Sequence, residues 1–161
     1  MAIWQFPIEL VPSQWVETND FNIELLYGEE GYDTTLAWEN YQPNNNYKQI
    51  FTDILPVTDS WDKELELWGD TKVHDISVWF DEGKIFSIGF RLDLREQIRE
   101  LVNKIISAAE KLDCYFFVPG QKIIFKPDFI SFIQYARQSN AAKFVNDPMK
   151  CLDEVAEKHN K

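Results

Sequence analysis

The chain has 161 residues, of which 45% are hydrophobic. This length allows one domain to bury a substantial core, but it is too short for two domains that each have a core of their own. Its formal net charge of −11 argues against nucleic-acid binding, because an acidic surface repels phosphates. No secretory-signal pattern opens the sequence, and no apolar stretch approaches the roughly 18 residues of a membrane span. We therefore expect one cytoplasmic domain over residues 1–161, without membrane contact.

The residues before position 60 predict three strands and one short helix. The strands are expected at 3–11, 21–27 and 34–39. In 21–27, Phe21, Ile23 and Leu25 alternate with polar residues, which is typical of a half-buried strand. A helix is expected ahead of Pro56, because apolar residues recur there at helical spacing. These residues are Tyr47, Ile50, Phe51 and Ile54.

Residues 63–68 alternate again and predict a further strand. Leu65 and Leu67 would face the core, and the glutamates that alternate with them would face solvent. The surrounding stretch, 59–70, concentrates carboxylates beside tryptophans, but its spacing does not match a calcium loop.

Residues 73–80 and 84–93 predict the clearest hairpin of the chain. The even-numbered residues of both strands are mostly apolar, so both sets must face the core. A two-residue turn would place core residues of one strand opposite solvent residues of the other. We therefore predict a three-residue loop, 81–83, which pairs Val78 with Phe86.

Helices and a second hairpin are predicted in the last part of the chain. Asp93 and Glu96 resemble an N-terminal capping box, so a helix should begin there. Its apolar stripe consists of Ile98, Leu101, Val102, Ile105, Ala108, Ala109 and Leu112. Residues 114–118 and 122–125 predict a hairpin, and a last helix is expected from Asp147. Between them, helical spacing recurs at Phe129, Phe132, Ile133 and Ala136.

This order of elements predicts the α+β class. Long antiparallel strands are followed by helices, without alternating strand-helix-strand units. We expect a single domain in which one twisted antiparallel sheet carries its helices mainly on one face. Residues 1–70 form its acidic, tryptophan-rich part, and residues 71–161 form its hairpin-helix part.

The sequence offers no motif for catalysis, metal binding or a cofactor. The nucleophile elbow, the phosphate-binding glycine loops, the paired C-x-x-C and the H-E-x-x-H motif are all missing. His74 lies on the apolar face of the hairpin, where we expect a neutral imidazole satisfied by a hydrogen bond. Cys114 lies in an apolar run that indicates burial. We therefore expect a protein that is not an enzyme and binds no metal or cofactor.

Acidic residues and tryptophans are concentrated in the same part of the chain. Residues 1–70 hold 14 of the 27 acidic residues and only two lysines, and all six tryptophans precede position 80. Acidic surfaces attract basic partners, and tryptophan is a favoured anchor in protein interfaces. We therefore expect a basic protein partner. Its predicted contacts are Glu29, Glu30, Asp59, Trp61, Asp62, Glu64, Glu66 and Asp70.

A small polar cluster is also predicted on the solvent side of the hairpin. In the register above, Asp75 and Arg91 become diagonal neighbours close to Ser77 and Ser87. Such a cluster could form a polar site. An ordinary cross-strand ion pair, worth under about 1 kcal/mol when exposed, explains the same residues.

The size, acidity and α+β build resemble those of the immunity proteins that bacteria keep against their own secreted nuclease toxins. The stretch from Trp68-Gly69-Asp70 to Arg91-Leu92-Asp93 is similar to bacterial proteins of this kind. The resemblance implies a stoichiometric inhibitor that covers a basic active-site cleft by charge complementarity, without a cofactor. The alternative is an enzyme that acts on a small molecule or glycan through carboxylates, because such catalysis leaves no local motif.

Overall fold

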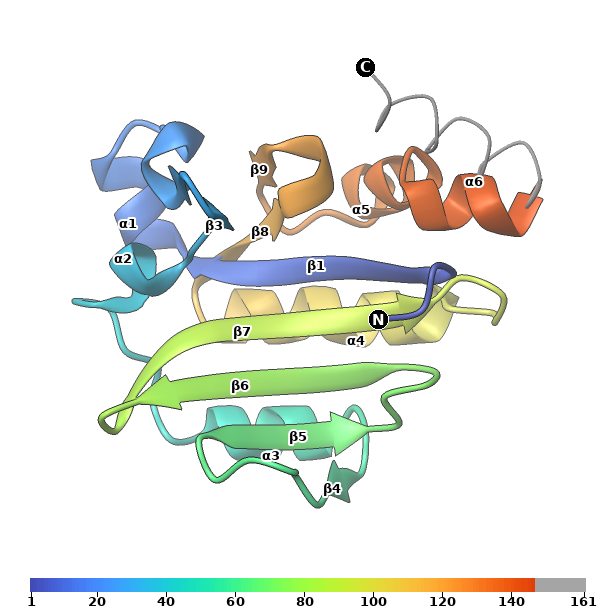
Figure 1. Ribbon diagram of the computed structural model, residues 1–161, viewed down its shortest axis with the longest axis horizontal. Helices are drawn as coiled ribbons and strands as arrows, with labels where there is room; N and C mark the ends of the chain where they lie inside the picture. Colours follow the sequence, from blue (N-terminus) through green and yellow to red (C-terminus); the bar gives the residue numbers. More distant parts are fainter. Residues whose placement is uncertain (147–161) are drawn as a thin grey trace.

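The computed structural model describes residues 1–146 and contains one seven-stranded antiparallel sheet with helices packed against it (Figure 1). This architecture confirms the predicted α+β class. The strands lie in the order β4-β5-β6-β7-β1-β8-β9. Their bounds are β1 Gln5–Pro12, β4 Val57–Thr58, β5 Leu65–Gly69, β6 Asp75–Asp81, β7 Lys84–Asp93, β8 Cys114–Val118 and β9 Ile123–Phe125. The helix predicted from Asp147 lies outside the described residues.

Four helices pack on one face of the sheet, as predicted. They are α3 Tyr47–Thr52, α4 Arg99–Lys111, α5 Phe129–Arg137 and α6 Asn140–Asn146. In Figure 1, α3 and α4 lie behind the strands. The core they enclose is rich in aromatic residues: the Phe132 ring of α5 lies 6.0 Å from Phe6 and 5.3 Å from Phe116, both in edge contacts. Such rings remove a large apolar area from water, so this face holds the main core of the domain.

The second face of the sheet is covered only in part. Four small elements pack around Val11 and Phe117. They are α1 Ser13–Thr18, the 3-10 turn η1 Ile23–Leu26, the two-stranded hairpin of β2 Tyr27–Gly28 and β3 Gly31–Tyr32, and α2 Thr35–Trp38. Elsewhere on this face Ser77, Ser87 and Gly89 are partly exposed, and Figure 1 shows β5, β6 and most of β7 without a helix in front of them. The candidate site lies on this open region.

The turn of the β6–β7 hairpin differs from the prediction. Asp81 pairs with Lys84, so the turn has two residues, and both adopt left-handed backbone angles, Glu82 at φ 50° and Gly83 at φ 81°. The register shifts after Trp79, which leaves Phe86 as an extra residue in β7. Val78 therefore pairs with Ile88, not with Phe86.

This β-bulge restores the alternation that a two-residue turn would break. Ile85 enters the main core opposite Phe80, and Ile88 then continues the same apolar face. The bulge is stabilised from outside the hairpin, because the Thr34 hydroxyl donates to the Phe86 carbonyl at 2.7 Å. The Gln42 amide also bonds both backbone groups of Ile85, at 2.8 Å each.

The predicted strands at 21–27 and 34–39 are wrong, since η1 and α2 occupy most of these positions. Local polar bonds explain both errors. Asn22 accepts a hydrogen bond from the backbone of Glu24, and Asp33 accepts one from the backbone of Thr35. Such side-chain to backbone bonds favour turns and helix starts over strands.

The predicted capping box at Asp93 is also wrong, because α4 begins only at Arg99. The Asp93 carboxylate accepts from the backbone N–H of Arg95 at 2.9 Å and from the Arg95 guanidinium. It therefore closes a local turn at the end of β7. Among residues 1–146, no helix is long and apolar enough to cross a membrane.

Gly69 and Gly83 provide a test of how tightly β5 and β6 approach. Both have positive φ, but a Cβ on Gly69 would lie 2.3 Å from the His74 carbonyl oxygen, whereas a Cβ on Gly83 would meet nothing within 4 Å. We expect Gly69→Ala to lower the free energy of unfolding by about 3 kcal/mol, and Gly83→Ala by about 1 kcal/mol. Urea unfolding of the two variants measures the difference, and equal losses would contradict the close approach at Gly69.

Candidate functional site

The candidate site is a hollow of about 820 Å³ on the open face of the sheet. It lies between the β2–β3 hairpin and the strands β1, β6 and β7. Its lining combines four carboxylates with three aromatic rings, and includes no lysine, arginine or histidine. The lining residues are Glu9, Gly28, Glu29, Glu30, Gly31, Tyr32, Asp33, Thr34, Trp79, Phe86 and Ser87.

The β2–β3 hairpin supplies one wall and the acidic rim. Tyr27 pairs with Tyr32, which leaves Glu29 and Glu30 exposed at the tip. Both tyrosines make edge contacts with the buried Phe117, with ring centroids 6.1 and 5.5 Å apart. These contacts hold the hairpin against the sheet, so the two rim carboxylates project from a fixed support.

The sheet supplies the base of the hollow. Glu9 comes from the centre of β1 and is only 7% exposed, although it carries an ionisable group. The Ser87 hydroxyl of β7 donates to its Oε1 at 2.9 Å. Glu9 faces Gly89 across the strand pair, where a Cβ would lie 3.4 Å from the Glu9 Cγ. The glycine therefore leaves room for the carboxylate to lie across β7.

Burial raises the pKa of Glu9, and the nearby charge of Asp33 adds to this effect. Polar contacts with Tyr32, Ser87 and Thr34 act in the opposite direction but do not cancel it. Burial also raises the pKa of Tyr32, with a further contribution from the charge of Glu9. A buried carboxylate with a raised pKa in a concave site is a common feature of binding and catalytic sites.

Glu9 differs from the other buried carboxylates in having no cationic partner. Among residues 1–146 there are three ion pairs, and each lies outside the hollow. Asp75 pairs with Arg91 and Asp93 with Arg95. The hollow is thus a region of uncompensated negative charge with aromatic walls.

The residues predicted for partner binding fall in four places. Glu29 and Glu30 lie on the rim of the acidic hollow. Asp59, Asp62 and Glu64 lie in the loop between β4 and β5, where the Asp62 carboxylate accepts from the Glu64 backbone.

Glu66 was predicted to face solvent, but it lies on the helix-covered side of β5. Its carboxylate accepts from the Tyr47 hydroxyl of α3 and lies 3.5 Å from the Lys48 Nζ. Leu65 and Leu67 are buried on the opposite side of the strand. Glu66 therefore links β5 to α3.

Trp61 and Asp70 line a second hollow, of about 740 Å³, together with Trp4, Arg91 and Arg95. Arg91 and Ser87 lie on the same face of β7, so the two hollows open on one face of the sheet, at opposite ends of the β6–β7 hairpin. Trp61 is 68% exposed and is thus the most accessible tryptophan in the described chain.

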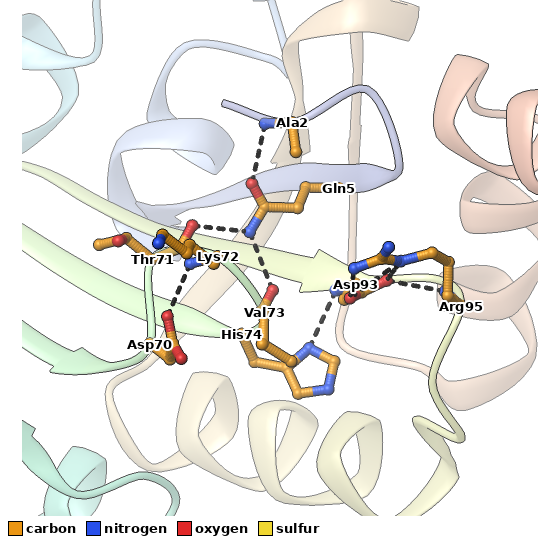
Figure 2. Close-up of polar contacts among 9 residues, drawn as sticks. All are labelled: Ala2, Gln5, Asp70, Thr71, Lys72, Val73, His74, Asp93 and Arg95. Atoms are coloured by element: carbon orange, nitrogen blue, oxygen red, sulfur yellow. Dashed lines mark hydrogen bonds and ion pairs between the residues drawn. The ribbon is translucent and has the colours of Figure 1, made fainter.

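Figure 2 shows that the polar groups beside the second hollow bond mainly to one another. Gln5 donates to the carbonyls of Thr71 and Val73, and the Asp70 carboxylate accepts from the Lys72 backbone. The Arg95 guanidinium pairs with Asp93 and lies 3.9 Å from the centre of the Trp4 ring. These contacts fix the turn between β5 and β6 and the end of β7.

His74 makes the hydrogen bond that the sequence predicts. Its Nδ1 accepts from the Asp93 backbone N–H at 2.9 Å, which requires that nitrogen to be unprotonated (Figure 2). Burial lowers the His74 pKa, against the opposing effects of Asp93, Glu96 and Asp75. Cys114 is also buried as predicted, and burial raises the pKa of its thiol.

Asp75 and Arg91 form a direct cross-strand pair instead of the predicted diagonal one. They are opposite each other in the ladder, and Arg91 Nη2 lies 2.5 Å from Asp75 Oδ2. The Asp75 side chain is fully buried, so this is not the exposed ion pair that the sequence predicts. Burial raises the Asp75 pKa, although Arg91 lowers it.

Sequence reasoning missed Glu9, Tyr32, Asp33, Trp79 and Phe86 as site residues. The sequence pattern predicts that Glu9 and Trp79 face solvent on their strands and that Phe86 faces the core. The bulge moves Phe86 to the hollow, and no local pattern places Tyr32 beside Glu9. The available signal was an acidic residue at the centre of a mostly apolar strand.

Comparison of the chain with family models, curated protein sequences and solved structures finds no match. Within residues 1–146, no three His, Cys, Asp or Glu side chains converge closely enough to hold a metal ion.

The raised pKa of Glu9 predicts a pH-dependent effect of Glu9→Gln. A carboxyl whose pKa is higher in the folded protein than its ordinary value of 4.5 favours folding when protonated, and this contribution is lost as pH rises through the folded pKa. Glutamine stays neutral, so Glu9→Gln should become more stable relative to wild type as pH rises above 4.5. Urea unfolding between pH 4 and 8 tests this, with the exposed Glu110→Gln as control; a pH-independent difference for Glu9→Gln would contradict it.

The burial of Asp75 predicts a large cost for removing its partner. Arg91→Ala leaves a fully buried carboxylate without a cation, so we expect a loss of about 3 kcal/mol in unfolding free energy. Lys48→Ala removes the partner of Glu66, where both side chains are partly exposed, and should cost at most about 1 kcal/mol. Chemical denaturation at pH 7 compares them, and a loss at Arg91 as small as that at Lys48 would show that Asp75 is not buried as an ion.

Proposed function

We propose that the protein is a binding module for a basic protein and that the acidic hollow is the centre of its contact surface. The observation that carries this proposal is a concave site lined by four carboxylates and three aromatic rings, with no cationic side chain in its lining. Such a site favours positive charge and offers large anchoring surfaces.

The distribution of charge over the chain supports the same proposal. Fourteen acidic residues and only two lysines lie in residues 1–70, which also supply the hollow with Glu9 and its rim. Negative charge spread over one part of a protein accelerates encounter with a basic partner and disfavours acidic ones. The loop that carries Asp59 and Asp62 is exposed and adds to this field.

The open region of the sheet has the properties of a docking surface. Ser77, Ser87 and Gly89 are small, partly exposed residues of β6 and β7 on this face, which also carries the two hollows. The exposed Trp61 lines the far hollow. A partner that covers this face would therefore meet the acidic rim at one end and an accessible aromatic anchor at the other.

The finer form of the proposal is a cytoplasmic immunity-type inhibitor that neutralises a basic, nuclease-like toxin of bacterial origin. Nuclease active sites bind phosphates through clustered cations, so an acidic, rigidly supported surface is complementary to them. No cofactor is required, because the inhibitor acts by occupying the cleft.

One observation favours a second candidate, an enzyme that acts on a small molecule or glycan. Burial raises the pKa of Glu9 beside the exposed Asp33, and a protonated carboxyl next to a second carboxylate is the arrangement of a general acid with a base. The two candidates differ in their need for a partner, since such an enzyme requires no basic protein.

Charge reversal at the rim tests the binding proposal. The tagged wild-type protein first captures its basic partner from lysate of its own source cells, and the dissociation constant is then measured for purified variants. We expect Glu29→Lys with Glu30→Lys to weaken binding by at least about tenfold and to reduce its salt dependence, because both exposed rim charges are inverted. The fold should stay intact.

The matched control inverts two exposed glutamates on the helix-covered side, Glu100→Lys and Glu110→Lys in α4. It has the same net charge as the rim variant, so it separates the effect of where the charges lie from the effect of net charge. Equal losses in the two variants would reduce the effect to overall charge. Unchanged affinity in the rim variant, or no basic partner at any salt concentration, would contradict the proposed function.

A further inference from the structure

We propose that the acidic hollow receives a single arginine side chain of the partner protein, with Glu9 as the carboxylate that pairs with its guanidinium. This inference rests on the proposed binding function and adds the residue that the site recognises. It is carried by the burial of Glu9, the aromatic walls around it and the shape of the hollow.

Glu9 is a buried anion that lacks a cation. It is 7% exposed and lines the hollow, and its polar contacts, with Ser87 at 2.9 Å and with Tyr32 and Thr34, are all made by neutral hydroxyls. The two comparable carboxylates, Asp75 and Asp93, each contact an arginine. Desolvating a carboxylate is costly unless a cation and hydrogen bonds replace its water. A guanidinium that enters from the hollow would supply both.

The aromatic lining favours arginine over lysine. Trp79, Phe86 and Tyr32 form walls around the carboxylate. A planar, weakly hydrated guanidinium can stack on such rings while it donates two parallel hydrogen bonds to one carboxylate. A lysine ammonium is strongly hydrated and lacks this planar fork, so it gains less in the same site.

The hollow also has the size and approach that an arginine needs. Its volume of about 820 Å³ exceeds that of one side chain, so the neighbouring backbone of the partner can enter with it. Glu29 and Glu30 stand exposed at the rim, where they attract the cation before it reaches Glu9. The buried charge then gives the specific contact.

Arginine binding should be coupled to the protonation of Glu9. Burial raises the pKa of this carboxyl in the free protein, whereas a bound cation favours its ionised form. Binding therefore releases a proton in the pH range where the free carboxyl is protonated. Affinity should fall as pH is lowered through this range.

The test uses small probes and the full chain. Nα-acetyl-arginine amide is titrated into the protein and followed by amide and indole NMR shifts, with Nα-acetyl-citrulline amide as the neutral isostere and Nα-acetyl-lysine amide as the second cation. We expect arginine to bind with a dissociation constant of about 1 mM. Citrulline should bind at least about tenfold more weakly, because it lacks the charge. The shifted signals should include Trp79, Ser87 and Gly31.

Two variants assign the contact to Glu9. Glu9→Gln keeps the shape and the hydrogen bond from Ser87 but removes the charge, so arginine binding should weaken by about tenfold. Glu110→Gln, exposed on α4, removes one charge elsewhere and should leave the constant unchanged. An NMR spectrum of each free variant shows that it is folded.

Each remaining outcome overturns part of the model. Equal binding of arginine and citrulline, or an unchanged constant in Glu9→Gln, refutes the assignment of Glu9. If no probe binds the hollow while the rim variant still loses the partner protein, the arginine inference fails and the proposed function stands. If the arginine probe binds but the rim variant still binds the partner, the natural ligand is a small guanidinium compound and not an arginine of a partner protein. The proposed function then fails as well.

Discussion

The extra residue at Phe86 is the constraint on which both faces of the sheet depend. A hairpin with a two-residue turn cannot keep the apolar residues of both strands on one face unless one strand contains a bulge. Here the bulge sends Ile85 into the core and Phe86 to the hollow. Its carbonyl is satisfied by Thr34, which also ties α2 and the adjoining β2–β3 hairpin to the sheet. The acidic rim is therefore positioned by the same irregularity that completes the core.

Three acidic side chains of the central strands are buried, and they differ in whether a cation pairs with them. Asp75 and Asp93 are fully buried, and each is paired with an arginine nearby. The Asp75–Arg91 pair joins β6 to β7, and the Asp93–Arg95 pair closes the turn at the end of β7. Glu9 is nearly as buried, and its polar neighbours Ser87, Tyr32 and Thr34 are neutral hydroxyls. A buried carboxylate without a cation at the base of an open hollow is the arrangement on which the proposed role in binding rests.

The strongly periodic parts of the sequence predicted the fold well, and the irregular parts did not. The hairpin strands, α4 and α5 carry long apolar patterns that tertiary packing follows directly. Residues 21–39 fold through single side-chain bonds from Asn22 and Asp33, which a pattern of alternation does not reveal. The rim glutamates could be predicted because exposure and charge are local properties. Glu9 could not, because its role depends on Ser87, 78 residues away in the sequence, and on the separate β2–β3 hairpin.

The alternation of side chains along β6 and β7 separates two kinds of position. Ile76, Val78 and Ile88 point into the main core, while Ser77, Trp79 and Ser87 lie on the open face. Adjacent positions therefore contribute to different properties, one set to stability and the other to the surface that the protein presents. Because the small polar residues of the open face are partly exposed, they can vary without loss of the core. Related chains could thus diverge in what they recognise while the sheet, its bulge and its helical layer stay the same.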